Sequence, residues 1–399
     1  MPLSSRQEIA MLITLMLVMF TAIADFMIMM PLASYLMDEF QINTAHFGLL
    51  VSAYSLAAGC SALLASSQAD RFDRRHALLF CYAGLIVATL ACGLSNSFYT
   101  LLAARILAGI FGGVIGSIVL AIVGDLIPVE RRGRAMSWVM LGFSISAVAG
   151  VPLGLWLAAQ SGWRMPFFAL TGICALVAVA MVRYVPPVRV HLATLNRDAS
   201  WVDNYRELLT VRNHWWAVSL TAMLMVSGFL VIPFIAPTMV ANVGLPASDL
   251  MYFYLVGGAA TIVSRPLIGG FTDRYSARKI MPWLVLASFV PILLITQNFK
   301  VGLPWHLMIS VLFFIFVSGR FIPASTMVTA ATVPHLRGRL MAFNSAMQNF
   351  ASGAASLLAG LLLTQDAQGH LHHYGWIGVL SCAAGLLAIW IARRIKAIS

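Results

Sequence analysis

The stretch Ser66-Ser-Gln-Ala-Asp70-Arg71-Phe-Asp73-Arg74-Arg75 follows a long apolar run in the first half of the chain. In the second half, Gly269-Gly-Phe-Thr-Asp273-Arg274-Tyr-Ser-Ala-Arg278-Lys279 follows another, with Asp273 lying 203 residues after Asp70. A second pair of basic loops, Arg132-Gly133-Arg134 and Arg337-Gly338-Arg339, recurs at an interval of 205 residues. Because order, spacing and position agree, the two signatures predict a duplicated unit rather than a chance similarity of basic loops.

The composition is that of a membrane protein. Hydrophobic residues make up 60% of the 399 residues and charged residues only 10%, against about 25% charged residues in soluble domains. The net charge of +11 does not indicate nucleic-acid binding, because the basic residues fall in short clusters between apolar runs. The five cysteines are scattered inside those runs, which is typical of packing residues and not of disulfides or metal ligands.

Twelve apolar runs are long enough to cross a bilayer, which takes about 20 helical residues. We therefore predict an all-α membrane protein with twelve transmembrane helices in two pseudo-symmetric six-helix bundles. The N-terminal run is too long for a signal peptide and lacks a cleavage site, so it counts as a span. The predicted spans are 9–36, 46–67, 77–96, 99–124, 135–160, 165–184, 214–241, 249–270, 280–298, 304–330, 340–364 and 375–392.

The basic residues predict the orientation. Twenty of the 25 lysines and arginines lie in the termini and in the loops on one side of the predicted membrane, and only Arg164 and Lys300 lie on the other. Basic loops stay in the cytoplasm, so both termini are expected there. The longest loop, 185–213, divides the chain into an N-terminal bundle (1–184) and a C-terminal bundle (214–399). It is either a solvated linker or a short amphipathic helix at the membrane surface.

These motifs resemble the major facilitator superfamily over the whole chain. The loop Asp70-Arg71-x-x-Arg74-Arg75 is similar to the family's most specific signature, although Ser66 and Asp73 replace its usual glycines. Three further stretches resemble the twelve-span drug:proton antiporters and the bacterial sugar-efflux transporters, although the third departs from the commoner Gly-Pro-x-x-Gly-Gly order. They are Asp25-Phe-Met-Ile-Met-Met-Pro31, Ala104-Arg105-x-x-Ala-Gly109-x-x-Gly112-Gly113 and Gly150-Val-Pro152-Leu-Gly154.

The resemblance implies a secondary transporter in the bacterial cytoplasmic (inner) membrane. It implies proton-coupled efflux of lipophilic or small organic compounds by alternating access. The proton gradient is the energy source, no cofactor is expected, and the transporter acts as a monomer in contact with lipid, substrate and protons. Two alternatives stay open: an exporter of sugars or other small polar metabolites, and an uncoupled facilitator. We expect no enzyme and no static scaffold, because the sequence lacks a recognisable catalytic or metal-binding motif and the paired loops suit a moving protein.

Asp25 is the only acidic residue within a predicted span of the first half. An ionised, unpaired carboxylate inside a bilayer costs several kcal/mol, so Asp25 needs a partner, water or a proton. Arg105, about 10 Å into its span at 1.5 Å per residue, is the expected partner. We predict that the two residues couple transport to protons. The alternative is a permanent structural ion pair.

The predicted substrate cavity combines deep polar groups with adaptable apolar walls. Methionine and aromatic side chains fit varied lipophilic ligands, and amides have little reason to face lipid. Most apolar members could equally face lipid or core. The predicted cavity residues are Met29, Tyr54, Arg105, Phe229, Phe234, Arg320, Asn344 and Gln348. By contrast, Arg265 is expected at the membrane interface, a turn before its loop. We predict no metal site and no catalytic residue.

A cytoplasmic gate and a bend complete the predictions. Acidic residues within basic loops are not explained by orientation alone, so ion pairs between loops are expected to latch the cytoplasmic side. For any single arginine, membrane orientation is an equally good explanation. Gly150, Pro152 and Gly154 predict close packing and a bend in the fifth span. The predicted gate residues are Asp70, Arg71, Arg74, Asp125, Arg134, Asp273 and Arg274.

Overall fold

The computed structural model describes residues 5–68, 72–189, 208–333, 336–366 and 368–398. Within these ranges the chain is almost entirely helical, and eleven helical segments are long and apolar enough to cross a membrane. A twelfth, α16 (Arg337–Leu362), has 26 residues, about 39 Å at 1.5 Å per residue. It is long enough to span but richer in polar side chains. The chain is therefore a multi-pass membrane protein, as its composition predicts.

The first half contributes six helical segments, and each overlaps a predicted span. Two of them are interrupted, one between α1 and α2 and the other by a π-helical turn, η2, between α6 and α7. The elements are α1 (Ser5–Ile28), α2 (Ala33–Phe40), α3 (Thr44–Gln68), α4 (Arg74–Leu94), α5 (Phe98–Leu126), α6 (Val129–Ile145), η2 (Ser146–Gly150), α7 (Val151–Ser161) and α8 (Met165–Tyr184).

The second half repeats this pattern, again with two interrupted segments. Besides α16 and two short strands, β1 (Thr364–Gln365) and β2 (Leu371–His372), it contains α10 (Arg212–Phe229), η4 (Ile232–Phe234), α11 (Ile235–Thr238), η5 (Met239–Val243), α12 (Leu250–Tyr275), α13 (Ala277–Thr296), α14 (Leu303–Gly319), α15 (Phe321–Ala330) and α17 (Tyr374–Ala392). The sequence analysis did not predict the strands, which pair antiparallel. Asn242 of η5 holds them in place through two hydrogen bonds with the backbone of Leu371.

Prolines account for most of the breaks. Pro31 lies between α1 and α2, Pro152 follows the π-helical turn η2, and Pro233 and Pro237 lie in the irregular stretch after α10. Proline lacks the N–H that would bond one turn back, so the helix must bend or rewind there. The predicted bend in the fifth span is thus a π-helical turn. The break between α14 and α15 falls at Arg320, just before Pro323, which cannot bond the carbonyl of Gly319.

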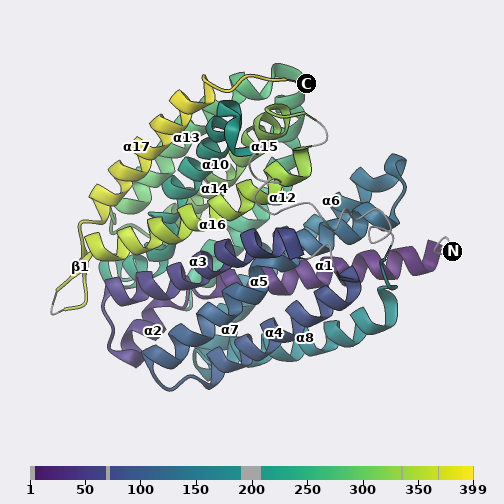
Figure 1. Ribbon diagram of the computed structural model, residues 1–399. Coiled ribbons are helices and arrows are strands. Elements are labelled where there is room, and N and C mark those ends of the chain that lie inside the picture. The colour runs from purple at the N-terminus through teal and green to yellow at the C-terminus, as the bar shows by residue number, and fades with distance from the viewer. Residues whose placement is uncertain (1–4, 69–71, 190–207, 334–335, 367, 399) are drawn as a thin grey trace.

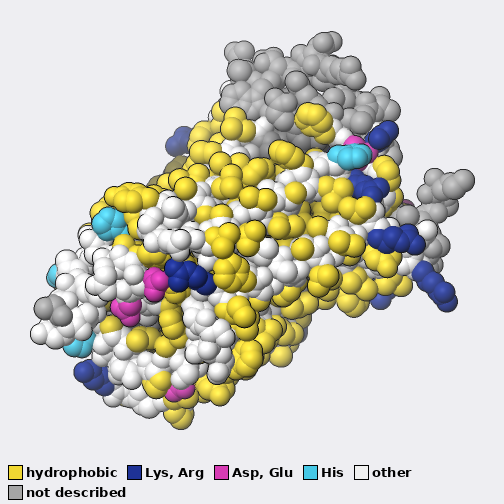
Figure 2. Space-filling view, turned by 90° about the horizontal axis from the view of Figure 1, so that it is seen from below, with side chains coloured by type: hydrophobic (Ala, Val, Ile, Leu, Met, Phe, Trp, Pro, Cys, Tyr) yellow, Lys and Arg dark blue, Asp and Glu magenta, His cyan; other side chains and the backbone are white. Residues whose placement is uncertain are grey.

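Two bundles converge at one end of the molecule and splay apart at the other (Figure 1). The strands β1 and β2 mark the convergent end, here called the hairpin end, and both chain termini lie toward the other, here called the terminal end. Between the two ends runs a broad apolar surface, with charged side chains gathered toward the ends (Figure 2). Such a belt is what a bilayer requires of the surface that faces it.

At the hairpin end, small residues bring α3 and α16 into backbone contact. A methyl group on Gly48 would lie 2.8 Å from the Ser356 carbonyl oxygen, and one on Gly360 would lie 2.6 Å from that of Thr44. The Thr44 hydroxyl donates a 2.8 Å hydrogen bond to the carbonyl of Leu363. Glycine lets two helices approach closely where no hydrophobic effect draws them together, so this crossing ties the bundles to each other.

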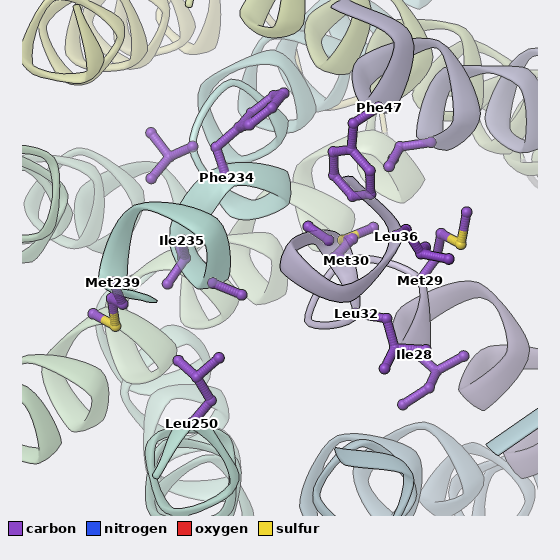
Figure 3. Close-up of a cluster of buried hydrophobic side chains, with 14 of the residues drawn as sticks. Ile28, Met29, Met30, Leu32, Leu36, Phe47, Phe234, Ile235, Met239 and Leu250 are labelled. Carbon is purple, nitrogen blue, oxygen red and sulfur yellow. The ribbon is translucent and has the colours of Figure 1, made fainter. Parts of the chain in front are cut away.

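A cluster of buried apolar side chains, here called the apolar lid, fills the space between the bundles at the hairpin end (Figure 3). Phe47 of α3 and Phe234 of η4 meet edge to face across it, with ring centroids 5.8 Å apart. Met29 is fully buried in the same cluster. The lid thus joins apolar side chains of both bundles. Its labelled members are Ile28, Met29, Met30, Leu32, Leu36, Phe47, Phe234, Ile235, Met239 and Leu250.

Candidate functional site

Asp25 and Arg105 form a fully buried ion pair inside the N-terminal bundle. The Arg105 Nη1 donates to Asp25 Oδ2 at 3.1 Å and to the Asp25 carbonyl at 3.2 Å. The Thr89 hydroxyl, on α4, donates to Asp25 Oδ1 at 2.8 Å. Both charged side chains have no exposed surface, and the Arg105 Nε has no hydrogen-bond partner. Removing either charge would leave the other buried and unpaired, which costs several kcal/mol.

Aromatic rings connect this ion pair to the opposite bundle. The Arg105 guanidinium lies 4.5 Å from the centre of the Tyr54 ring, a favourable cation–π distance. Tyr54 in turn contacts Phe26 at 5.0 Å, and Phe26 contacts Phe229 of the C-terminal bundle at 5.9 Å. Phe26 follows Asp25 directly in the chain. A change in the charge or position of Asp25 therefore acts one residue away from an inter-bundle contact.

Arg320 lies inside the C-terminal bundle. Its guanidinium donates to the hydroxyls of Ser227 and Ser288, at 3.1 and 3.2 Å, and to the carbonyl of Leu224 at 3.1 Å. These partners belong to α10 and α13, and Arg320 has no exposed surface. No carboxylate within the described residues forms an ion pair with it. Its polar contacts thus all come from its own bundle, and not from the seam between bundles.

The other predicted cavity residues fall into separate places. Met29 and Phe234 belong to the apolar lid, whereas Tyr54 and Phe229 lie beside the ion pair. Asn344 is buried and accepts a 2.5 Å hydrogen bond from Thr221 of α10. The structure thus brings two of the predicted cavity residues next to Asp25 and Arg105.

Gln348, one turn from Asn344 on α16, is half-buried. The structure records no hydrogen bond from its side chain to another described residue. Its amide therefore remains available, unlike that of Asn344.

The predicted gate residues are only partly described. Asp70 and Arg71 lie outside the described residues. Arg74 pairs with Asp125 at 2.7 Å, which joins α4 to α5 within one bundle. On the other side, Arg274 lies over the ring of its neighbour Tyr275 at 5.3 Å. Arg134 and Asp273 are exposed. No ion pair among the described gate residues links the two bundles, in keeping with their separation at the terminal end.

Gly150 and Gly154 both face α1 of the same bundle. A methyl group on Gly150 would lie 3.3 Å from the Ala24 side chain, and one on Gly154 would meet the Ile28 side chain. The opposite bundle, through α12, packs on α7 and on the start of η2, where a methyl group on Gly258 would lie 2.9 Å from the Ala147 carbonyl. Pro152 directly follows this π-helical turn. The turn places Ala147 against α12.

Asp73 has a structural role that the sequence analysis missed. Its carboxylate accepts hydrogen bonds from the N–H of Arg75, the N–H of Val188 and the Nε of Arg189, at 2.9, 3.2 and 2.9 Å. Partial burial raises the pKa of Asp73, but these hydrogen bonds outweigh it and hold the pKa below its ordinary value. Asp73 therefore caps α4 and fastens the segment after α8 to it. Only its acidic character within a basic loop could have indicated this.

Arg265, which the sequence predicts at the membrane interface, contacts the opposite bundle in the structure. It is ten residues from the end of α12 at Tyr275, about 15 Å at 1.5 Å per residue. Its Nη1 donates to the Ser144 hydroxyl of α6 at 3.4 Å, and its guanidinium lies 5.0 Å from the centre of the Phe143 ring. The sequence analysis ended this span five residues too early and so placed Arg265 too close to the loop.

Comparison with known proteins gives a consistent picture. The chain is 25% identical over 371 residues to a probable sugar efflux transporter of Helicobacter pylori (strain G27), covering 91% of this chain and 89% of the relative. It is 26% identical over 376 residues to a chloramphenicol resistance protein of Streptomyces lividans, covering 88% and 87%. In fold, it matches the crystal structure of a D-xylose–proton symporter with a TM-score of 0.81, at 14% identity and 98% coverage of both chains.

The family comparison covers both halves of the chain. The sequence model of the Major Facilitator Superfamily matches residues 15–271 and, separately, residues 218–397. Two overlapping matches of one model fit the internal repeat of the basic loops. The fold has twelve helical segments in two bundles. The family match and the transporter relatives each cover nearly the whole chain, so fold and sequence indicate the same family. The chain belongs to the Major Facilitator Superfamily.

Proposed function

We propose that this protein is a proton-coupled exporter of small organic compounds that works by alternating access. The observation that carries the proposal is the buried Asp25–Arg105 pair, one residue from the Phe26–Phe229 contact between bundles. The names of the two relatives, one for sugar efflux and one for chloramphenicol resistance, support export as the direction. We further propose a bacterial inner-membrane location with the terminal end in the cytoplasm, in keeping with its basic loops.

The coupling step follows from electrostatics. Ionised Asp25 holds Arg105 through one hydrogen-bonded ion pair to its carboxylate, and its backbone carbonyl accepts a second hydrogen bond. The surrounding is apolar, where such interactions are strong. Protonation of Asp25 removes the charge that compensates Arg105. The arginine must then find another acceptor, and its contact with Tyr54 and hence with Phe26 changes. In this proposal, proton binding and the seam between bundles are linked by these four side chains.

The apolar lid supplies the second element of the cycle. In the structure the lid and the α3–α16 crossing close the hairpin end, while the bundles diverge at the terminal end. A substrate from the cytoplasm would enter at the terminal end and leave once the lid parts. The lid contains only apolar side chains, whose contacts lack the direction of hydrogen bonds, so they can separate and re-form as the bundles rock.

Export of sugars or other polar metabolites is the second candidate, favoured by the name of the Helicobacter relative. Sugar hydroxyls need amide and hydroxyl partners. Of the two predicted cavity amides, Gln348 forms no hydrogen bond with another described residue, whereas Asn344 is already bonded to Thr221. A single amide is a weak basis for binding a polyhydroxylated ligand, so a less polar substrate is the better fit.

The test is flux in proteoliposomes containing the purified protein. With an imposed proton gradient, wild-type protein should transport a fluorescent lipophilic dye across the membrane. The pH of the lumen should change at the same time and in proportion to the dye transported. Asp25→Asn should abolish gradient-driven accumulation and leave at most downhill exchange. Removing one member of a buried pair costs about 3–5 kcal/mol, so retention of fold is checked by gel filtration.

A matched control exists on the same helix. Glu8 of α1 is also paired with an arginine, because Arg131 donates to it at 3.0 and 3.1 Å, but this pair is at the surface. Glu8→Gln should leave coupling intact, since an exposed pair contributes only about 0–1 kcal/mol. Gradient-driven transport that survives in Asp25→Asn would remove Asp25 from the mechanism.

A further inference from the structure

Arg265 is a deep cation at the seam between the bundles, and the ion-pair mechanism does not use it. It is half-buried and lies on α12 of the C-terminal bundle, against Phe143 and Ser144 of α6 in the N-terminal bundle. Along both helices, the contact of Arg265 with α6 lies far from the terminal end. Ser144 is 15 residues into α6, about 22 Å, and Arg265 is about 15 Å from the end of α12.

The guanidinium has spare donors. The Ser144 hydroxyl, at a long 3.4 Å, is its one hydrogen-bond partner within the described ranges. No atom of Arg265 is among the buried polar atoms that lack a partner, whereas the Nε atoms of Arg105 and Arg320 are. The remaining donors of Arg265 are thus accessible. An arginine has five N–H donors in a planar fork that fits a carboxylate through two bonds.

Charge balance points the same way. The helices carry three deep arginines, Arg105, Arg265 and Arg320, and one deep acid, Asp25, which Arg105 already holds. The C-terminal bundle therefore has two interior cations and no interior carboxylate within the described residues. Charges inside a membrane protein are costly unless they are compensated. Arg320 is enclosed by hydroxyls and a carbonyl, which leaves Arg265 as the cation that a ligand can reach.

The position of Arg265 relative to Asp25 suits binding near the coupling site. A methyl group on Gly142 of α6 would lie 2.8 Å from the backbone nitrogen of Phe20 on α1. The Ser144 region is therefore level with Phe20, and Asp25 is five residues further along α1, about 8 Å along its axis. The seam closes toward the hairpin end at Gly258, two helical turns from Arg265.

We propose that Arg265 is a substrate-binding residue and that the transported compound is an organic anion, whose carboxylate binds Arg265 at the seam between α6 and α12. This inference rests on the proposed function and adds the substrate class. Phe143, whose ring the guanidinium already contacts, would pack against the apolar part of the ligand. A bound carboxylate takes the place of the weak Ser144 bond, so binding alters a contact between the two bundles.

The experiment measures binding to purified protein in nanodiscs, with pairs of compounds that differ only in charge. The probes are benzoate and benzamide, cinnamate and cinnamamide, and octanoate and octanamide, with Kd taken from ligand-dependent thermal shifts. At least one acid should bind about tenfold to a hundredfold more tightly than its amide, as expected for a hydrogen-bonded charge pair. In Arg265→Gln that preference should fall below about threefold.

Two further variants keep the result interpretable. Arg265→Lys keeps the charge without the fork and should retain part of the preference for the acid. Lys279→Gln, at an exposed position on α13, should retain all of it. The inference fails if the wild-type protein prefers no acid in the panel over its amide. It also fails if Arg265→Gln keeps the full preference, which is the result expected of a purely structural link between bundles.

Failure of this inference is distinguishable from failure of the proposed function. Proton-driven flux of neutral compounds, without any preference for acids, would leave the exporter standing and remove the role of Arg265. Acid-selective binding without proton-driven flux of any compound would support Arg265 as a binding residue and remove the proton-coupled exporter.

Discussion

At the scale of single residues, the charges inside the helices differ in how they are compensated. Asp25 and Arg105 compensate each other, Arg320 is satisfied by hydroxyls, and Arg265 is only weakly bonded. The same three arginines are indistinguishable by residue type and by their apolar sequence surroundings. Their different partners separate the proposed coupling residue Arg105 from Arg320, which its own bundle encloses, and from Arg265, the proposed ligand-binding residue.

Asp73 supports a prediction on stability and pH. Because its pKa is held below the ordinary value of about 3.9, its contribution is fully present above that value. The contribution is lost as the pH falls through the folded-state pKa. Asparagine keeps an oxygen that can cap α4 but loses the negative charge, so Asp73→Asn should lower stability at neutral pH by about 0.5–1 kcal/mol through the weakened Arg189 pair and helix-dipole interaction. Thermal midpoints in detergent, measured from about pH 3 to pH 8, check this.

The difference between wild type and Asp73→Asn should narrow toward the acidic end of that range. A constant or widening difference would show that the carboxylate charge is not what fastens the segment after α8. Asp38→Asn is a suitable control, because Asp38 is exposed and such surface changes stay within about 0.5 kcal/mol.

At the scale of elements, the crossing of α3 and α16 determines whether the hairpin end can close. Gly360 and Gly48 bring the two backbones together, and a methyl group at Gly360 would lie 3.0 Å from the Gly48 Cα. Gly360→Val should prevent this approach and open the apolar lid. The measurement uses Met30→Cys protein in which serine replaces the exposed Cys60. A membrane-impermeant maleimide should label Met30→Cys at least about tenfold faster with Gly360→Val than without it. That ratio corresponds to a population shift of about 1.4 kcal/mol.

The control for Gly360→Val is Gly172→Val in α8, since a side chain on Gly172 would meet no atom within 4 Å. It should leave the labelling rate of Met30→Cys unchanged. Slow labelling in correctly folded Gly360→Val protein would mean that the lid stays closed without the glycine crossing.

At the scale of the whole molecule, closed contacts at one end and divergence at the other describe one state of a rocking pair of bundles. Spin labels report the two ends separately when the five native cysteines are replaced. One label pair at Gly133 and Gly338 would measure the terminal end, where added side chains meet nothing. Another at Asp38 and Ser248, both exposed, would measure the hairpin end.

Asp25→Asn should change the populations at both ends in opposite senses, because closing one end of a two-bundle protein opens the other. Pulsed electron resonance of the two label pairs, with and without Asp25→Asn, gives the distance distributions. Distances that lengthen at both ends together would indicate loosening and not rocking. If Asp25→Asn changes neither distance distribution, the ion pair does not control the movement of the bundles.

The amino-acid sequence by itself determined the membrane class, the order and approximate limits of the helical segments, and the pairing of Asp25 with Arg105. These follow from local rules. About 20 apolar residues cross a bilayer, prolines break helices, and a lone deep acid needs a partner. The hairpin β1–β2 escaped prediction because strands of two residues leave no periodic pattern.

Only the tertiary structure decided which way each helix faces. Lipid and the interior of a helical bundle are similarly apolar, so a helix that is hydrophobic all round does not reveal in its sequence which side meets lipid, its own bundle or the opposite one. For that reason Met29 and Phe234 proved to be lid residues, and Gly48 and Gly360 went unnoticed. The contact of Arg265 with the opposite bundle also went unnoticed, because only packing shows where a long side chain finds its partners.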